Sequence, residues 1–398
     1  MSRRKKMLDL NLAQAYMKVG HFDAWLIYDF RGNNPVMWEA IGEKKSTTRR
    51  SFLLIPKKGN PKFLVHLLDR LLFSNIPYDL EVYISWPDMQ NKLKDLLKGY
   101  IDIAMEYSPG AAIPVMSWVD GGTLDLVRSY GKEVRSSANI FQVATATWTK
   151  EAFDSHCRAC KEVVEIKDAA FAYIKRAIRM NSSVTEYEVQ EFIMQEFQKR
   201  GLETEDRPVV AVNENSGNPH YQPTAILDSP ITKGDWILID LWAKYPGDKN
   251  IFSDITWVGF VGDEVPIKYL EVFEVVKKAR NLVIDSLEQA WKSGEIQQGW
   301  ELDMVARTVI EDAGYGEHFV HRTGHSIGPG PSVHALGVNL DNLETHDMRG
   351  VLPGIGFSIE PGIYLQDFGV RLEIDVFIDP KKGPIVTTPI QSEVIKLV

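Results

Sequence analysis

Residues 236–260 read WILIDLWAKYPGDKNIFSDITWVGF, and this stretch predicts two β-strands joined by the turn PGDKNIF. The letters ILID place Asp240 at the end of a hydrophobic strand, and FSDITW places Asp254 inside the next one. Both acids alternate with bulky apolar neighbours, which is the pattern of side chains along a strand. An ionised carboxylate that is buried alone is very unfavourable. We therefore expect each of the two to be paired, hydrogen-bonded or bound to metal.

Two further acids follow the same pattern near the end of the chain. FSIEPG places Glu360 after a β-rich run and before a Pro-Gly stop, and VRLEIDVF places Glu373 in the core of a strand. Taken singly, each acid could be half of a buried salt bridge. The cations in these segments are Lys244 and Arg371, which are too few to neutralise four carboxylates. A pair of divalent ions about 3.5–4 Å apart would be sufficient, because carboxylates can bridge them.

Three of the nine histidines fall within residues 321–334, HRTGHSIGPGPSVH, among three glycines and two prolines. His325 is the candidate nitrogen ligand that accompanies the acids. Oxygen ligands with a single imidazole favour Mn²⁺, Co²⁺ or Zn²⁺ over a thiolate-type site. His220, in the polar loop NSGNPHY, is a further candidate, and a purely surface position in that loop is the equal alternative.

The composition is that of an ordinary globular protein. The 398 residues are 44% hydrophobic and 25% charged, and the formal net charge is −9. Nucleic acid is not expected as a partner, because binding phosphates needs clustered Lys and Arg. No run of about 18 apolar residues predicts a membrane span. RRKK at residues 3–6 precedes an amphipathic helix pattern rather than the apolar core of a signal peptide, which predicts a cytoplasmic location.

The length of the chain and the change in its secondary-structure pattern near residue 149 predict two domains, 1–148 and 149–398. The first is α/β, with a helix, a glycine turn and a strand over residues 12–30 and two strands joined by KKGNP over residues 51–68. We expect it to be a scaffold or a substrate-capping domain. The second is mixed α+β, with helices predicted at 150–179, 185–201, 266–294 and 302–314. A Thr185-x-x-Glu188 capping box marks the start of the second of these helices.

The two cysteines, Cys157 and Cys160, are spaced CRAC within the helical pattern of residues 150–179. A redox or metal role is conceivable for this spacing. No second Cys/His pair at zinc-finger spacing accompanies it, so a purely structural place in the helix is the favoured interpretation.

The motifs, taken together, resemble the "pita-bread" metallopeptidases of family M24. In chain order they are NPHY, IDLWAKY, FSDITW, HRTGHSIG, IEPGIYL and FGVRLEIDVFI. The order Asp, Asp, His, Glu, Glu is similar to that of the family's metal ligands. EPG-x-Y and GVR-x-E resemble the Xaa-Pro aminopeptidase and prolidase branch. The resemblance covers about residues 150–398 and implies an α+β pita-bread catalytic domain that follows a creatinase-type α/β domain.

The resemblance also implies roles for the candidate residues. Two divalent ions per chain, Mn²⁺ first and Co²⁺ or Zn²⁺ as alternatives, would be held by Asp240 on one ion, His325 and Glu360 on the other, and Asp254 and Glu373 bridging both. Glu360 would also transfer a proton, and the substrate would be contacted by His220 and His334. The implied reaction is hydrolysis of the Xaa-Pro bond in dipeptides or at peptide N-termini, by a hydroxide that bridges the metals. A homodimer is implied as well.

Some segments depart from the family's pattern. DITWV and GPGPSVHALG differ from the usual forms, and the turn between Asp240 and Asp254 is longer. These changes favour, as an alternative, a hydrolase or lyase of a small non-peptide substrate on the same metal site. A non-catalytic binding homologue is a second alternative, against which the retention of all five candidate ligands argues. No G-x-G-x-x-G follows a strand, which excludes a dinucleotide enzyme. His321 has no implied role and is expected to be structural.

Overall fold

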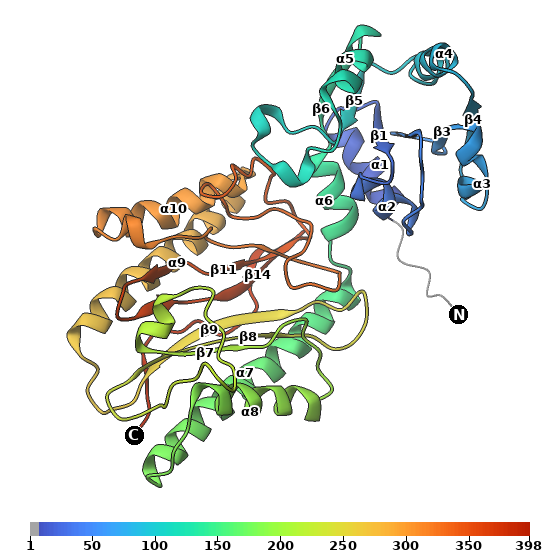
Figure 1. The fold of residues 1–398 in the computed structure, drawn as a ribbon. Coiled ribbons are helices and arrows are strands. Elements are labelled where there is room, and N and C mark those ends of the chain that lie inside the picture. The colour runs from blue at the N-terminus through green and yellow to red at the C-terminus, as the bar shows by residue number, and fades with distance from the viewer. Residues whose placement is uncertain (1–7) are drawn as a thin grey trace. The chain divides into compact units, whose positions relative to one another are not determined.

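The computed structural model describes residues 8–398, so RRKK at 3–6 lies outside the described residues. Figure 1 shows the chain as two compact units. The described residues up to Thr145 form the first, and Ala146–Val398 form the second. The chain therefore divides at 145/146, slightly before the predicted 148/149. In the described part of the chain, no helix is both long and apolar enough to cross a membrane.

The first unit contains a six-stranded sheet in the order β4-β3-β2-β1-β5-β6. β1 pairs antiparallel with β2 and parallel with β5, so the sheet is mixed. The predicted helix–turn–strand and the predicted strand pair are both present. The strands are β1 (Ala24–Phe30), β2 (Arg50–Pro56), β3 (Lys62–His66), β4 (Asp79–Tyr83), β5 (Asp102–Met105) and β6 (Glu133–Ser136). The helices are α1 (Leu10–Val19), α2 (Pro35–Ile41), α3 (Arg70–Phe73), α4 (Trp86–Leu96), α5 (Gly121–Ser129) and α6 (Ala138–Ala146).

The second unit begins with the predicted long helix. Thr149 caps its N-terminus by accepting from the backbone N–H of Ala152, and the capping box of Thr185 and Glu188 starts the next helix as expected. The fourth helix begins earlier than predicted, because Gln298 and Glu301 form a second capping box that the sequence pattern did not reveal. The helices are α7 (Lys150–Arg179), α8 (Glu186–Lys199), α9 (Ile267–Ser293) and α10 (Gly299–Asp312).

Three small sheets make up the strand content of the second unit. Their orders are β16-β9-β8-β7, β10-β11-β14-β15 and β12-β13. The strands are β7 (Val209–Val212), β8 (Trp236–Ala243), β9 (Ser253–Phe260), β10 (Ser326–Ile327), β11 (Gly356–Ile359), β12 (Gly362–Tyr364), β13 (Gly369–Arg371), β14 (Ile374–Asp379), β15 (Gly383–Val386) and β16 (Ile395–Lys396). In Figure 1, α7 and α8 lie along the β7–β9 sheet, and α9 and α10 lie on the side of β11 and β14.

A hydrophobic core joins α7 and α8 to the β7–β9 sheet. Ile237, Ile239 and Leu241 of β8 and Ile255 of β9 are fully buried in it, together with Phe171 of α7. Because side chains alternate along a strand, the residues between these apolar ones point to the opposite face. Asp240 and Asp254 are on that opposite face, which is where the site is built.

The structure corrects two predictions about strands. Asp240 is inside β8 rather than at its end, because the antiparallel pairing with β9 continues to Ala243. Glu373 does not lie in a strand core. The chain leaves β13, which pairs with β12, and enters β14, which pairs with β11 and β15. Glu373 occupies the crossing between these two sheets, where its N–H donates to the Thr256 carbonyl at 3.2 Å.

Candidate metal centre

Two of the candidate ligands come from the hairpin β8–β9. In its register Asp240 is opposite Thr256, and Asp254 is opposite Trp242. Residues directly opposite each other on antiparallel strands project from the same face, and Asp254 and Thr256 are two positions apart on one strand. The two aspartates therefore share one face of the sheet with the Thr256 hydroxyl between them.

The other three candidates lie at the ends of strands from the neighbouring sheets. His325 directly precedes β10, and Glu360 directly follows β11. Backbone hydrogen bonds fix both, because the Ser358 N–H donates to the His325 carbonyl at 2.9 Å and the Glu360 N–H donates to the Thr323 carbonyl at 2.7 Å. Glu373 is held from its side chain as well, since the Thr256 hydroxyl donates to its Oε2 at 2.7 Å.

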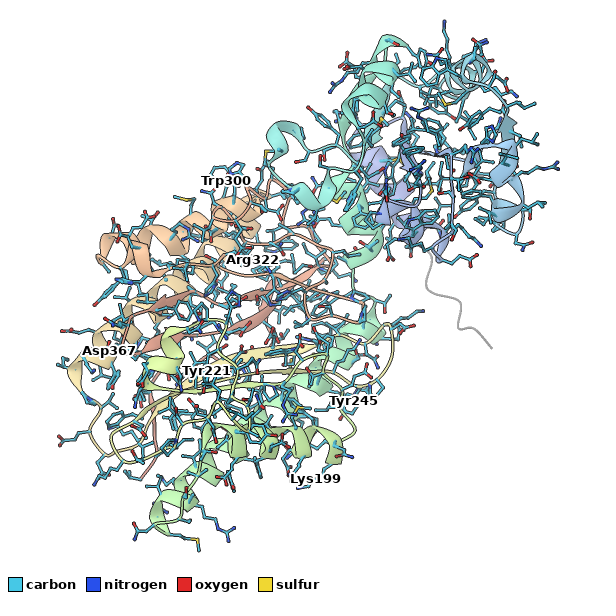
Figure 2. All side chains as sticks on the ribbon, viewed as in Figure 1. Lys199, Tyr221, Tyr245, Trp300, Arg322 and Asp367 are labelled. Atoms are coloured by element: carbon cyan, nitrogen blue, oxygen red, sulfur yellow. The ribbon has the colours of Figure 1, made fainter. Side chains whose placement is uncertain are left out.

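The donor atoms converge across the seam between the sheets. The Nε2 atom of His325 lies 3.3 Å from Asp254 Oδ2 and 3.6 Å from Glu360 Oε1. One donor atom each of Asp254, His325 and Glu373 fall within 4.8 Å of one another. All five side chains line one cavity of about 910 Å³. Tyr221 and Arg322, which Figure 2 labels, line the same cavity.

The two histidines predicted to contact substrate also line this cavity. The ring of His334 lies 4.1 Å from that of His325, centroid to centroid. His220 is exposed at the cavity wall, in the loop that follows β7. His321, which was expected to be structural, also lines the cavity, with its Nε2 2.7 Å from the Tyr364 hydroxyl and its Nδ1 2.7 Å from the Arg322 carbonyl.

Arg371 is the one basic residue of the two predicted counter-ions that reaches the acids. Its Nη2 donates to Asp240 Oδ2, its Nε donates to Thr256 Oγ1 at 2.9 Å, and its Nη1 donates to the Tyr364 hydroxyl at 3.1 Å. Lys244 points elsewhere, since its Nζ donates to the Gly330 carbonyl at 2.5 Å. One guanidinium thus faces four carboxylates, which leaves an excess of negative charge.

The raised pKa values of three of these carboxyl groups reflect the excess of negative charge. Burial, followed by the adjacent Glu373 and Asp240 carboxylates, raises the pKa of Asp254 well above its usual range. Burial and the carboxylates of Glu360 and Asp240 do the same for Glu373. Burial also raises the pKa of Asp240, although Arg371 acts in the opposite direction. Without added positive charge, these acids compete for ionisation.

The pKa values of His325 and Glu360 are lowered, whereas those of Asp240, Asp254 and Glu373 are raised. Burial and the neighbouring His334 lower the pKa of His325 to about 3, so its imidazole is neutral near pH 7. Burial alone would raise the pKa of Glu360, but the nearby Arg371 and Arg322 guanidinium groups favour its ionised form, and its pKa lies below the usual value. A neutral imidazole and an ionised carboxylate are the forms that bind metal ions.

The donor set fits divalent metal ions. Asp240 Oδ1 and Asp254 Oδ1 are buried and have no hydrogen-bond partner among the described residues. An unpartnered buried carboxylate oxygen is costly, and a metal ion would satisfy both. Four carboxylates, one imidazole and no thiolate make a set for hard or borderline cations. His325 and Glu360 could hold one ion and Asp240 another, with Asp254 and Glu373 contributing to both.

Sequence reasoning missed the residues that organise this site. Thr256, Tyr364 and the three-way bonding of Arg371 were not identified. A signal was present for Thr256, because it follows Asp254 at the two-residue spacing of one strand face. Tyr364 lies within the EPG-x-Y motif, which was used only to mark the family branch; its contact with His321 joins segments far apart along the chain and could not be predicted locally.

Comparison with known proteins agrees with the fold. The model of metallopeptidase family M24 matches residues 158–380, and the chain belongs to this family. The Xaa-Pro dipeptidase of Lactobacillus helveticus is 31% identical over 243 residues, which are 58% of this chain and 61% of that protein. The Xaa-Pro dipeptidase of Lactobacillus delbrueckii subsp. lactis is 30% identical over 239 residues, 56% of this chain and 58% of that protein. The chain thus matches about three fifths of the length of these relatives.

Among solved structures, the dipeptidase PepE from Mycobacterium ulcerans is similar to this chain with a TM-score of 0.63. The two are 20% identical, and the match covers 98% of this chain and 97% of that one. The similarity shows the pita-bread fold together with the N-terminal α/β domain that the sequence predicted.

Proposed function

We propose that this protein is a metallopeptidase with two divalent ions that hydrolyses the bond between an N-terminal residue and proline. The observation that carries the proposal is the convergence of Asp240, Asp254, His325, Glu360 and Glu373 from separate strands, with two carboxylate oxygens left unpartnered. The Xaa-Pro dipeptidases among the relatives support the choice of substrate.

Each proposed ligand has a place. Asp240 would hold one ion and His325 and Glu360 the other, with Asp254 and Glu373 contributing to both. When bound, the ions supply Lewis-acid polarisation of the scissile carbonyl and a water molecule of lowered pKa. Mn²⁺ is the proposed ion, because carboxylates dominate the set and neither cysteine lines the cavity.

The chain's own residues account for the remaining chemistry. Glu360 has a lowered pKa and is ionised near neutral pH, so it accepts a proton from the attacking water and delivers it to the departing proline nitrogen. His334 and His220 line the cavity and donate hydrogen bonds to the carbonyl oxygen as negative charge develops there. A proline amide has no N–H, and this site needs none.

Purified protein tests the proposal directly. It would be prepared without chelator, its metal content measured, and hydrolysis of Ala-Pro and Ala-Pro-Ala assayed with added Mn²⁺, Co²⁺ or Zn²⁺. The expected result is about two ions in the cavity and cleavage of at least one peptide. Bound metal without cleavage of either peptide would reject the Xaa-Pro assignment and favour a small non-peptide substrate. Protein that binds no metal at the cavity would reject the site.

The proposal also includes a cytoplasmic location, as predicted from the sequence pattern, and a homodimer, which rests on the family resemblance. Size-exclusion chromatography with light scattering tests the second. A mass near twice 45.1 kDa is expected, and a mass of one chain across a range of concentrations would contradict it.

A further inference from the structure

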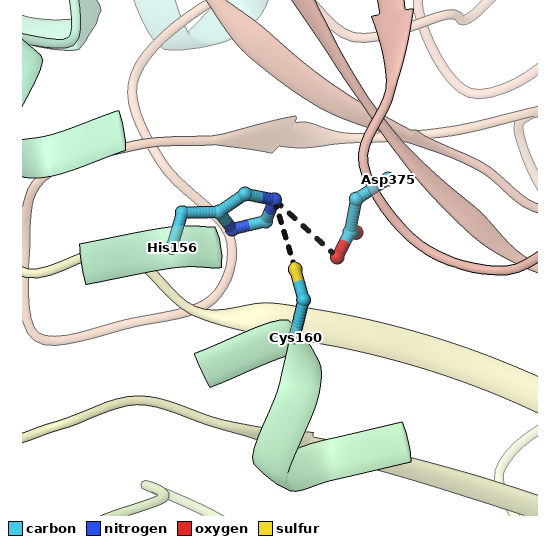
Figure 3. Close-up of side chains that lie close together, drawn as sticks. All are labelled: His156, Cys160 and Asp375. Atoms are coloured by element: carbon cyan, nitrogen blue, oxygen red, sulfur yellow. Dashed lines mark hydrogen bonds and ion pairs between the residues drawn. The ribbon is translucent and has the colours of Figure 1, made fainter. Parts of the chain in front are cut away.

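A second cluster of metal-binding residue types lies outside the cavity. His156 and Cys160 are one turn apart on α7, and Asp375 is the second residue of β14. All three are buried, and none of them lines the cavity. Figure 3 shows the three side chains pointing at a common centre, with His156 Nε2 3.3 Å from Cys160 Sγ and 3.9 Å from Asp375 Oδ2.

The hydrogen bonding of His156 directs the lone pair of its Nε2 atom toward the other side chains of the cluster. Nδ1 lies 2.7 Å from the Phe252 carbonyl oxygen, which can only accept, so the proton is on Nδ1. Nε2 then presents its lone pair to Cys160 and Asp375. A metal-binding histidine usually donates its other N–H to a backbone carbonyl or a carboxylate in this manner.

Asp375 lacks a counter-ion in this buried place. Its Oδ2 accepts from the backbone N–H of Asp254 at 2.9 Å, and its Oδ1 has no hydrogen-bond partner of normal geometry. Among the residues that the structure describes, no Lys or Arg lies within ion-pair distance of this carboxylate. A buried carboxylate needs a cation or a proton. A divalent ion with one thiolate and one carboxylate would give a site of zero net charge.

The spacing suits a tetrahedral ion. Zn²⁺ bonds of about 2.0–2.3 Å place neighbouring ligand atoms about 3.3–3.6 Å apart. The observed 3.3 Å from His156 Nε2 to Cys160 Sγ lies within this range, and the 3.9 Å from Nε2 to Asp375 Oδ2 exceeds it by a few tenths of an ångström. The Thr387 hydroxyl is hydrogen-bonded to His156 Nε2 at 2.7 Å and would release this nitrogen to an ion by donating only to the Asp375 carbonyl oxygen, which lies 3.1 Å away. We propose that His156, Cys160 and Asp375 bind one further metal ion, Zn²⁺, separate from the pair in the cavity.

This ion would have a structural effect on the strands of the cavity. It would tie α7 to β14 through Asp375, whose carboxylate also holds the Asp254 backbone and which lies two residues after Glu373. The proposal is independent of the peptidase activity, because it concerns different side chains. It gives the CRAC spacing a partial role, since Cys160 is buried and Cys157 is exposed.

Cobalt distinguishes the two sites without any activity measurement. The cavity offers no thiolate, so a thiolate-to-Co²⁺ charge-transfer band in the near ultraviolet can come only from a cysteine. The full-length protein would be produced in medium in which Co²⁺ replaces Zn²⁺, so that the metal enters as the chain folds. The expected result is this band with one equivalent of Co²⁺, which persists in an Asp254→Asn, Glu373→Gln variant.

Paired cysteine variants assign the band. Cys160→Ser is expected to abolish it, and the matched control Cys157→Ser, three residues away on the same helix, is expected to retain it. Should Cys160→Ser fail to fold, X-ray absorption of the wild-type zinc protein replaces it, with one sulfur neighbour expected at about 2.3 Å. Cobalt-loaded wild type without the band, or zinc protein without a sulfur neighbour, would overturn the proposal and leave a neutral hydrogen-bonded cluster. Loss of the cavity metals alone would bear only on the peptidase.

Discussion

His325 Nε2 lies 3.3 Å from Asp254 Oδ2, although the histidine precedes β10 in one sheet and the aspartate belongs to β9 in another. Neither sheet contains a complete set of candidate ligands. The candidate ligands come together only where the two sheets meet, so the site depends on the charges and the packing at that junction.

Asp254 is the first residue to test, because the proposal makes it a ligand of both ions. Asp254→Asn keeps the shape of the side chain and removes its charge. We expect the loss of at least one ion per chain and a fall in kcat/KM of at least about 100-fold, since a metal ion contributes several kcal/mol to such a reaction. Metal analysis and peptide hydrolysis measure these changes. Asp263→Asn, at an exposed aspartate, is the control, and full activity in Asp254→Asn would refute the assignment.

The metal-free protein is expected to lose stability as pH rises. The folded pKa values of Asp254 and Glu373 lie above their unfolded values. The folded state therefore binds more protons than the unfolded state between those values, and stability falls across that window as pH rises. We expect the Tm of metal-free protein to fall between pH 5 and pH 8 by at least about 2 °C more than that of an Asp254→Asn, Glu373→Gln variant. Equal slopes for the two proteins would contradict the electrostatic account.

Divalent metal should reverse this pH effect. Added Mn²⁺ neutralises the carboxylates, so it should raise Tm more at pH 8 than at pH 5 in the wild type. Ligand binding to the folded state alone adds about 2.7 kcal/mol at a concentration 100 times Kd. Differential scanning fluorimetry at both pH values gives the comparison. A chelator should restore the metal-free Tm.

Arg371 is expected to matter for both stability and metal binding. Arg371→Met removes the donor to Asp240 and Thr256 and leaves Asp240 buried without its cation. Breaking a buried pair costs about 3–5 kcal/mol, which urea denaturation would detect. Lys268→Met is the matched control, because its ion pair with Asp367 is exposed and such pairs contribute about 0–1 kcal/mol. Equal losses in the free energy of unfolding for the two variants would show that the buried pair of Arg371 contributes no more than an exposed one.

Gly356 tests the packing behind the centre. A Cβ added to this first residue of β11 would lie 2.1 Å from Trp148 Cζ2. The Trp148 indole stacks on Phe377 and donates to the Ile327 carbonyl at 2.9 Å, so it has little freedom to move. Gly356→Ala should therefore cost about 1–3 kcal/mol. Gly121→Ala, where an added Cβ meets nothing within 4 Å, should be close to neutral.

Local pattern was sufficient for much of this molecule. A long helical pattern predicted α7, a capping box and glycine stops predicted α8 and the end of α9, and strand alternation showed that Asp240 and Asp254 lie between apolar neighbours. The local pattern could not predict which distant segments pair with one another. Glu373 was assigned to a strand core because VRLEIDVF is continuously β-prone, whereas the break arises from β13 and β14 joining different sheets. His156 was not identified as a candidate ligand, because its contact with Asp375 joins segments that lie far apart in the sequence.

The crossing of the chain at Glu373 has a consequence for assembly. While only one sheet is formed, the incomplete donor set cannot grip a cation strongly. The donor set is complete only when the Glu373 N–H is bonded to the Thr256 carbonyl and the sheets are joined. Bound metal would therefore distinguish correctly folded molecules from incompletely folded ones, because only molecules whose sheets have joined would retain the ions.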